Sequence, residues 1–272
     1  MDSDGCVLDT MEPKHRECFT PALIGEWGLQ EIAPLVRAGF LGLNLYSVHR
    51  GVNRFLALQL FWQWLDGRRP DLARARPPGD RFEAWVRHGG ALSETSLAAE
   101  LARYPDDAAL EQTLRWSRRV NQLIQALPPA RAFAGAAEAL HDAMTAGALH
   151  VVSGGNGAAI REEWHATGLD PLVSQFHTQE AGSKERILRS LAASLGADNG
   201  LMVGDAPGDA DAAGATGVPF FPIRPGHEAE SWREFRTEIL PAFRTGRYGA
   251  VDAHVRTASF RTLLATSIAS LA

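Results

Sequence analysis

The sequence predicts an α/β protein: a Rossmann-like parallel sheet with helices on both faces, into which an all-helical domain is inserted. Two observations predict this fold. Short apolar runs alternate with helical stretches over residues 149–223, which is typical of parallel strands joined by helices. Residues 15–128 show mostly helical periodicity and no strand pattern of comparable strength.

The alternating segment contains the predicted strands, at residues 149–152, 172–176, 201–203 and 218–223. Apolar residues at helical spacing after Lys184, and an alanine-rich stretch after Pro207, predict two of the connecting helices. Polar residues after the C-terminal ends of parallel strands line a ligand crevice, so we expect a site at these strand ends.

These patterns divide the chain into three expected parts. Residues 1–14 and 129–245 form the α/β core, residues 15–128 the helical domain, and residues 246–272 a C-terminal helical extension. Helical periodicity within the inserted domain predicts helices at residues 31–41, 53–65, 97–103 and 108–127.

Composition and charge argue against several classes of protein. A net charge of −5 gives no general attraction to nucleic acid or anionic membrane, and no apolar run approaches the roughly 20 residues that span a bilayer. Cys6 and Cys18 form no CxxC pair and are too few for a disulfide framework, and the N-terminus lacks signal-peptide features. We therefore expect a soluble cytoplasmic protein, a monomer or small homo-oligomer, that acts on a small molecule.

The first chemical motif is Asp2-Ser3-Asp4-Gly5, which has carboxylates at positions i and i+2. One carboxylate can act as a nucleophile while the other gives a proton to a leaving oxygen. The same residue types are common in turns, so this segment alone favours a turn over a site.

Two further segments suit the binding of an anion. Ser153 and Gly154 follow the first predicted strand, where a hydroxyl and backbone N–H groups can hold phosphate; the alternative is a plain helix cap and turn. Lys184, one of two lysines in the chain, begins a helix, where the helix dipole disfavours a cation. It can neutralise a phosphate, or it is a solvated surface lysine.

The last motif contains two acids. Asp205 ends the third predicted strand, and Asp209 follows four residues later on the first turn of a helix. Carboxylate oxygens suit Mg²⁺, which keeps several waters and takes few protein ligands. Acids at a helix start also complement the helix dipole, which is the alternative explanation. Asp211 is two positions further along and is expected to point elsewhere.

In order and spacing, these segments resemble the motifs of the haloacid dehalogenase superfamily: DxDG, a strand-end Ser or Thr, a Lys, and GDxxxD. The resemblance covers residues 1–14 and about 129–224. The helical insertion lies between the first and second motifs, where this superfamily places its type-one cap. The resemblance therefore implies the phosphatase-like branch with a helical type-one cap.

The resemblance also implies a role for each residue. Asp2 would be the nucleophile that forms an aspartyl-phosphate, and Asp4 the general acid that later activates water. Ser153 would bind the phosphoryl group and Lys184 would neutralise its charge. The implied Mg²⁺ ligands are Asp205, Asp209, the carboxylate of Asp2 and the backbone carbonyl of Asp4.

The implied activity is Mg²⁺-dependent hydrolysis of a small-molecule phosphate monoester. A dehalogenase does not need Asp4, and a phosphonatase needs a cap lysine, which this chain offers only as Lys14 at the cap edge. A sugar-phosphate mutase or phosphotransferase stays open, because it uses the same core residues. A catalytically impaired binding protein is a further alternative.

Within the cap, Arg50, Asn53 and Arg54 flank a glycine and are expected to contact an anionic or polyhydroxylated substrate. A guanidinium group matches the geometry of phosphate or carboxylate. The alternative is a solvated helix start with surface arginines.

The chain departs from the superfamily pattern at its start. The nucleophile of that superfamily ends a central strand, about 5 residues in a typical sheet, whereas Met1 alone precedes Asp2 here. We expect the first core strand to be missing, with loss of its ladder hydrogen bonds and buried side chains. This chain is therefore predicted to be poorly stable or weakly active, and upstream coding sequence is predicted to restore activity.

Overall fold

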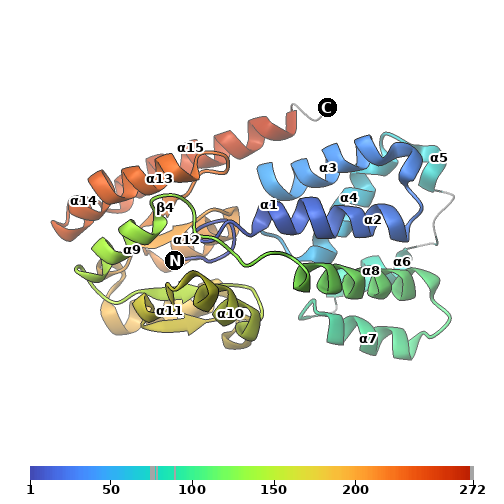
Figure 1. Ribbon diagram of the computed structural model, residues 1–272, viewed down its shortest axis with the longest axis horizontal. Helices are drawn as coiled ribbons and strands as arrows, with labels where there is room; N and C mark the ends of the chain where they lie inside the picture. Colours follow the sequence, from blue (N-terminus) through green and yellow to red (C-terminus); the bar gives the residue numbers. More distant parts are fainter. Residues whose placement is uncertain (74–76, 78, 89, 270–272) are drawn as a thin grey trace. The chain divides into compact units, whose positions relative to one another are not determined.

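The computed structural model describes residues 1–73, 77, 79–88 and 90–269 (Figure 1). Positions 74–76, 78, 89 and 270–272, which fall in the predicted ranges 15–128 and 246–272, lie outside the described residues. The contacts divide the chain into two compact units. The α/β unit comprises Met1–Glu12 and Pro128–Thr266, and the helical unit contains Pro13–Leu127.

Short parallel strands form two pairs in the described part of the α/β unit. They are β1 (His150–Val152) with β2 (Gln175–His177), and β3 (Met202–Gly204) with β4 (Phe220–Pro222). Each lies within or beside a run that the sequence predicts as a strand. Strand β2 begins at Gln175, later than the predicted residue 172, because Asp170–Leu172 forms a 3-10 turn (η3) before it.

Met1 and Asp2 lie between the two strand pairs. The backbone N–H of Val152 donates to the Met1 carbonyl at 2.8 Å, and the Met1 amino group donates to the His150 carbonyl at 2.7 Å. On the other side, the Asp2 N–H donates to the Val203 carbonyl at 2.8 Å. These two residues therefore supply ladder hydrogen bonds to β1 and β3 at the position of the central strand, although no strand is assigned to them.

Helices cover both sides of the strands, as the sequence predicts. In Figure 1, α10 and α11 lie on one side of the strands and α13–α15 on the other. The helices of this unit are α9 (Ala136–Met144), α10 (Gly157–Thr167), α11 (Lys184–Leu195), α12 (Pro207–Thr216), α13 (Glu228–Glu234), α14 (Leu240–Arg244) and α15 (Ala250–Ala269). Shorter turns are η4 (Gln179–Ala181), η5 (Ala197–Asn199) and the π-helical η6 (Phe235–Ile239).

Local caps start the helices that follow strand ends. The Asn156 side chain accepts hydrogen bonds from two backbone N–H groups of α10, and the Ser183 side chain accepts one from Arg186 in α11. Pro207 occupies the first turn of α12, where its missing N–H costs nothing. Helix starts, and the side chains on them, are thus placed at the strand ends by short-range interactions.

The core of the α/β unit is formed by apolar residues of the strands and the helices around them. Val151, Val203 and Phe221 pack with the fully buried Trp164 and Trp232 in one cluster. A second cluster joins Met202 and Phe220 of the strands to Phe260 and Leu264 of α15. The helix within the predicted C-terminal extension therefore buries side chains against this unit.

The helical unit contains no strand among its described residues. It comprises α1 (Met11–Pro13, shared at the boundary), η1 (Lys14–Phe19), α2 (Thr20–Glu26), η2 (Gln30–Ile32), α3 (Ala33–Tyr46), α4 (Arg54–Asp66), α5 (Pro70–Ala73), α6 (Asp80–His88), α7 (Glu94–Arg103) and α8 (Ala108–Gln125). Its core contains many aromatic residues, and Phe19 and Phe55 each pack against Trp116. No described helix of the protein is both long and apolar enough to cross a membrane.

Candidate active site

Three carboxylates from separate segments meet at the strand ends of the α/β unit. They belong to Asp2, to Asp205 directly after β3, and to Asp209 in the first turn of α12. One oxygen atom of each lies within 4.8 Å of the others, and the residues are 6%, 1% and 0% exposed. Among the described residues, this group alone has a spacing of acidic, histidine or cysteine ligand atoms that could hold a metal ion.

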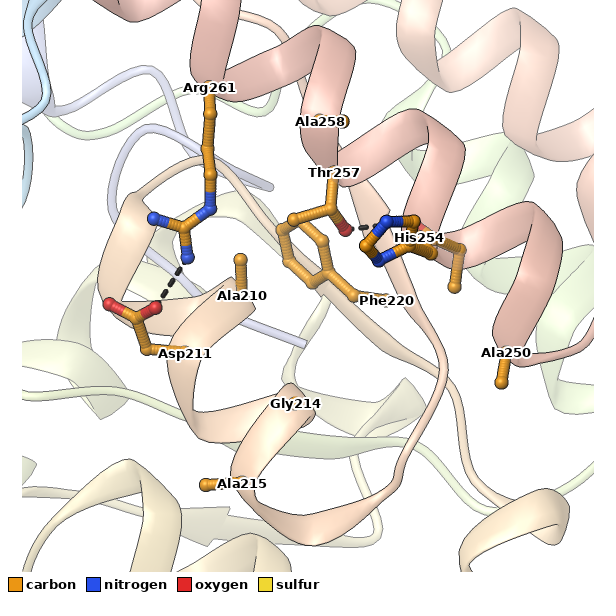
Figure 2. Close-up of a pocket in the computed structure, with 11 residues that line it drawn as sticks. Ala210, Asp211, Gly214, Ala215, Phe220, Ala250, His254, Thr257, Ala258 and Arg261 are labelled. Carbon is orange, nitrogen blue, oxygen red and sulfur yellow. Dashed lines mark hydrogen bonds and ion pairs between the residues drawn. The ribbon is translucent and has the colours of Figure 1, made fainter.

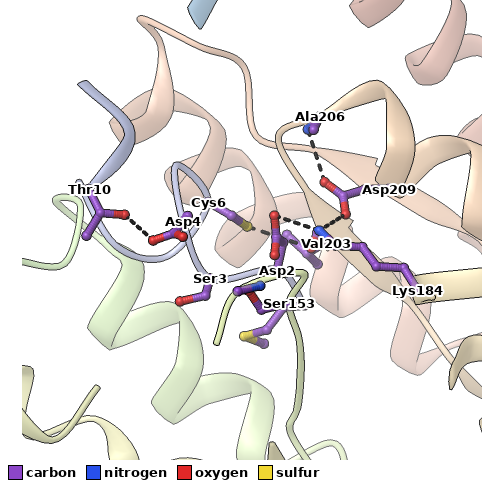
Figure 3. Close-up of polar contacts among 12 residues, drawn as sticks. Asp2, Ser3, Asp4, Cys6, Thr10, Ser153, Lys184, Val203, Ala206 and Asp209 are labelled. Atoms are coloured by element: carbon purple, nitrogen blue, oxygen red, sulfur yellow. Dashed lines mark hydrogen bonds and ion pairs between the residues drawn. The ribbon is translucent and has the colours of Figure 1, made fainter. Parts of the chain in front are cut away.

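The ammonium group of Lys184 joins this cluster from the start of α11 (Figure 3). Its Nζ lies 2.9 Å from Oδ2 of Asp2 and 2.6 Å from Oδ1 of Asp209. The lysine that the helix dipole disfavours is thus held by two carboxylates from other segments. Within these four groups the negative charges exceed the positive ones by two.

Burial and charge act in opposite directions on these groups. Burial raises the pKa of Asp2 to about 6; the Lys184 ammonium opposes this rise, and the Asp209 carboxylate adds to it. Burial disfavours the charged form of Lys184, but Asp2 and Asp209 outweigh it and raise the lysine pKa above its ordinary value. The lysine therefore stays charged, while the cluster as a whole resists further negative charge.

Asp209 approaches the strand end closely because residue 204 is a glycine. A Cβ atom on Gly204 would lie 2.5 Å from Cγ of Asp209, closer than carbon atoms can approach without displacement. The other oxygen of this carboxylate, Oδ2, accepts a hydrogen bond of 3.1 Å from the backbone N–H of Ala206. The glycine and the aspartate of the GDxxxD segment are thus coupled by packing.

Asp4 lies in the same turn as Asp2 but has a different neighbour. Its Oδ1 accepts a hydrogen bond of 2.5 Å from the hydroxyl of Thr10, and Figure 3 shows it on the opposite side of the turn from Lys184. Gly5 follows with a φ of 75°, a left-handed conformation that glycine adopts without strain. The turn therefore separates the two carboxylates, with Asp2 in the three-carboxylate cluster and Asp4 outside it.

Ser153 and Gly154 lie at the end of β1, next to the strand position that bonds to Met1. Ser153 is 3% exposed, and its Oγ accepts a hydrogen bond of 3.1 Å from the N–H of Gly155. Gly154 is exposed and has open space around the position of a Cβ. The hydroxyl and the exposed backbone are thus placed at the same sheet edge as Asp2.

The cap residues singled out in the sequence are engaged within the helical unit. Arg50 is 3% exposed and donates a hydrogen bond of 2.6 Å to the Leu45 carbonyl. Arg54 donates a bond of 2.7 Å to the side chain of Asn121, and Asn53 caps the start of α4. These contacts stabilise the helical unit itself, and the contact of these residues with a substrate stays a prediction.

Asp211 lies outside the carboxylate cluster. Its side chain is 65% exposed and forms an ion pair with Arg261 of α15. Figure 2 shows this pair beside a groove of about 520 Å³ between α12 and α15, with Phe220 and His254 among its lining residues. The two-residue offset from Asp209 thus turns the side chain toward solvent.

Sequence reasoning missed several residues that contact the Asp2–Asp4 turn. Thr10 binds Asp4, the Trp164 indole binds Ser3, and the Trp232 indole binds the Cys6 carbonyl. Thr10 is near enough in sequence to have been considered. The two tryptophans carry no local signal, because their bonds reach across 161 and 226 positions.

Comparison with known proteins bears on the family of this chain. The sequence matches the family described as haloacid dehalogenase-like hydrolase over residues 1–217. Comparison with curated proteins gave no match. A solved structure described as "Crystal Structure analysis of a Dehalogenase" is 18% identical, has a TM-score of 0.42, and covers 87% of this chain and 88% of that chain. Another, "Crystal Structure analysis of a Dehalogenase with intermediate complex", is 16% identical, has a TM-score of 0.41, and covers 82% of each chain.

The matched residues include every segment that builds the carboxylate cluster with Lys184: the turn after Met1, the start of α11 and the β3–α12 junction. The match also extends over most of the 272 residues of the sequence. The protein therefore belongs to the haloacid dehalogenase-like hydrolase family.

Proposed function

We propose that this hydrolase is a Mg²⁺-dependent phosphatase that cleaves a small phosphate monoester through an aspartyl-phosphate on Asp2. One observation carries the proposal: three buried carboxylates lie together, and a single ammonium group pairs with two of them. Buried charge is costly unless it is neutralised, and an all-oxygen donor set suits Mg²⁺. Asp2, Asp205 and Asp209 would hold the ion, which when bound would neutralise charge on the phosphoryl oxygens.

The chemistry of the leaving group supports phosphate over halide. A halide departs from carbon as a stable anion, so its displacement by a carboxylate needs neither a proton donor nor a metal ion. An alkoxide leaving a phosphate ester needs a proton, and the charged phosphoryl group needs cations around it. Asp4 would supply the proton, and Lys184 together with an ion held by the carboxylate cluster would supply the positive charge.

The residues would act in two steps. An oxygen of Asp2 attacks phosphorus while the bond from phosphorus to the ester oxygen breaks, and Asp4 gives its proton to that oxygen. The Asp4 carboxylate then takes a proton from a water molecule that attacks phosphorus. The bond to Asp2 breaks, which releases inorganic phosphate and regenerates both aspartates. Thr10 would orient Asp4 through its hydrogen bond, and Lys184 would orient Asp2 through its ion pair.

The test is a screen of the protein against phosphate monoesters and 2-haloacids, with Mg²⁺ or with a chelator, scoring phosphate and halide release. We expect Mg²⁺-dependent phosphate release that is lost in Asp2→Asn and in Asp4→Asn. Asp211→Asn is the matched control, because it changes an exposed aspartate of α12 outside the cluster.

Halide release that survives in Asp4→Asn and needs no Mg²⁺ would instead identify a dehalogenase. Isomerised sugar phosphate without free phosphate would identify a mutase. Absence of any turnover, with binding of a phosphorylated compound retained, would identify a binding protein.

A further inference from the structure

Two tryptophan indoles donate hydrogen bonds to the turn that carries Asp2 and Asp4. Nε1 of Trp164, in α10, donates to Oγ of Ser3 at 2.8 Å. Nε1 of Trp232, in α13, donates to the carbonyl of Cys6 at 3.0 Å. Both tryptophans are 0% exposed. The two bonds therefore hold the turn at two points, on either side of Asp4.

Ser3 is the central residue of this turn. Its carbonyl accepts hydrogen bonds from the N–H groups of Cys6, Val7 and Leu8 at 3.3, 3.1 and 3.0 Å. Its side chain is fully buried and is the acceptor for the Trp164 indole. Because Ser3 lies between the two aspartates, a rotation of its backbone would move both carboxylates, and the indole bond resists that rotation.

The backbone hydrogen bonds from this segment to β1 and β3 are formed by Met1 and Asp2. The two indole bonds follow at Ser3 and Cys6, directly after these backbone bonds. Catalysis requires carboxylates held to within about 0.5 Å of their working positions. The indole bonds thus hold the residues that lie between and shortly after the two aspartates.

Simple core packing does not account for the placement of these indoles. A buried indole N–H needs an acceptor, but any nearby carbonyl satisfies it. Trp116 of the helical unit shows this case, because its Nε1 donates to the Phe19 carbonyl at 3.4 Å, and the described residues of that unit contain no group of acidic, histidine or cysteine side chains spaced to hold a metal ion. Trp164 and Trp232, from two different helices, both direct their donors to the turn of residues 3–6.

We propose that Trp164 and Trp232 are positioning residues for the reaction of Asp2 and Asp4, Trp164 through the Ser3 hydroxyl and Trp232 through the Cys6 carbonyl. The inference rests on the proposed function, since it concerns the turnover of that reaction. Neither indole needs to touch the substrate. Their effect is on the orientation of the aspartates and hence on kcat, with little effect on KM.

The experiment compares Trp164→Phe, Ser3→Ala and the double variant in the full-length protein, with Trp232→Phe as a separate variant. Each single change removes one partner of a hydrogen bond: Ser3→Ala removes only the hydroxyl, and the Trp→Phe changes keep a smaller aromatic ring. Trp116→Phe is the matched control, because it removes an equally buried indole from the helical unit. The measurements are kcat and KM for phosphate release, together with a thermal melt of each variant.

We expect kcat to fall about tenfold to a hundredfold in Trp164→Phe and in Ser3→Ala, the scale of a small misplacement of catalytic groups. The double variant should be no worse than the poorer single variant, because both changes break the same bond. KM should stay near the wild-type value, and Trp116→Phe should keep the wild-type kcat even if its melting temperature drops.

Equal kcat in Trp164→Phe, Ser3→Ala and Trp116→Phe would overturn the inference, as would effects that multiply in the double variant. A second readout separates this failure from failure of the proposed function. If the wild-type protein releases no phosphate, the phosphatase proposal fails. The contact is then judged by the indole N–H signal of Trp164 in NMR spectra, which Ser3→Ala should shift and open to solvent exchange. An unchanged signal would overturn the contact itself.

Discussion

The two units of this protein hold charged groups in different ways. In the helical unit, the buried Arg50 donates a hydrogen bond to a backbone carbonyl, and the half-buried Arg54 donates one to an amide side chain. In the α/β unit, Asp2, Asp205 and Asp209 are buried close to one another, and Lys184 is the counter-charge of Asp2 and Asp209. Satisfied cations stabilise a fold, whereas like charges held together destabilise it. Repulsion between buried like charges is expected at a functional site, so we expect the reaction to take place in the α/β unit.

The largest effect that tests this comparison is expected from Lys184→Met. Removal of the ammonium leaves Asp2 and Asp209 buried without it, a change that costs about 3–5 kcal/mol when one partner of a buried pair is lost. We expect phosphate release to become undetectable and the free energy of unfolding to fall by this amount. Chemical denaturation measures the second effect. A stability equal to that of wild type would mean that the cluster is not strained.

Addition of Mg²⁺ is expected to stabilise the protein by relieving the same excess of negative charge. An ion present at 100 times its dissociation constant adds about 2.7 kcal/mol to the stability of the folded state. Thermal melts with and without Mg²⁺ should therefore differ for wild type and for Asp211→Asn, and should coincide for Asp209→Asn. A Mg²⁺ effect of equal size in Asp209→Asn would remove that residue from the metal site.

Gly204→Ala tests the close approach of Asp209 to the strand. The added methyl group would lie 2.5 Å from Cγ of Asp209, so the carboxylate must move. Overpacking of this kind costs about 1–3 kcal/mol, and we expect the Mg²⁺-dependent activity to fall with it. Gly208→Ala is the control, because a Cβ there meets nothing within 4 Å. Similar losses in both variants would contradict the packing argument.

The smallest expected effects come from Arg50→Ala and Arg54→Ala in the helical unit. Arg50→Ala removes a donor to the buried Leu45 carbonyl, and Arg54→Ala removes a donor to the half-buried Asn121 side chain, so we expect the free energy of unfolding to fall by about 1 kcal/mol. A higher KM at unchanged kcat would support the predicted contact with substrate. Loss of stability with KM and kcat unchanged would restrict these arginines to the fold of the helical unit.

Much of the fold is readable from the sequence, because the relevant interactions are local. Apolar runs bounded by turn residues predict the strands, and 3.6-residue periodicity predicts α4 (Arg54–Asp66) and α8 (Ala108–Gln125) to within a few residues. The segment before β2 is a 3-10 turn instead, because Pro171 lies in its first turn and its N–H is missing for a strand ladder. Local sequence patterns do not predict contacts between residues that are far apart in the chain.

The same difference between local and long-range interactions applies to the candidate site. The order of Asp2, Ser153, Lys184, Asp205 and Asp209 along the chain was sufficient to predict the family, which the match over residues 1–217 confirms. Ser153 and Asp205 follow strands, and Lys184 and Asp209 lie in the first turns of helices. Their distances were not predictable. Thr10 and the two tryptophans were missed, because hydrogen bonds of side chains to a turn depend on how helices pack and not on spacing in the sequence.

By itself, the sequence determined which residue types stand at the strand ends and helix starts of this protein, because turns, caps and periodicity act over a few residues. Only the tertiary structure decided that Lys184 joins Asp2 to Asp209 and that Trp164 holds Ser3. These contacts link residues 25 to 182 positions apart, and they form only when the strands have paired and the helices have packed on them. A buried charge or indole then takes the partner that the packed core places within reach.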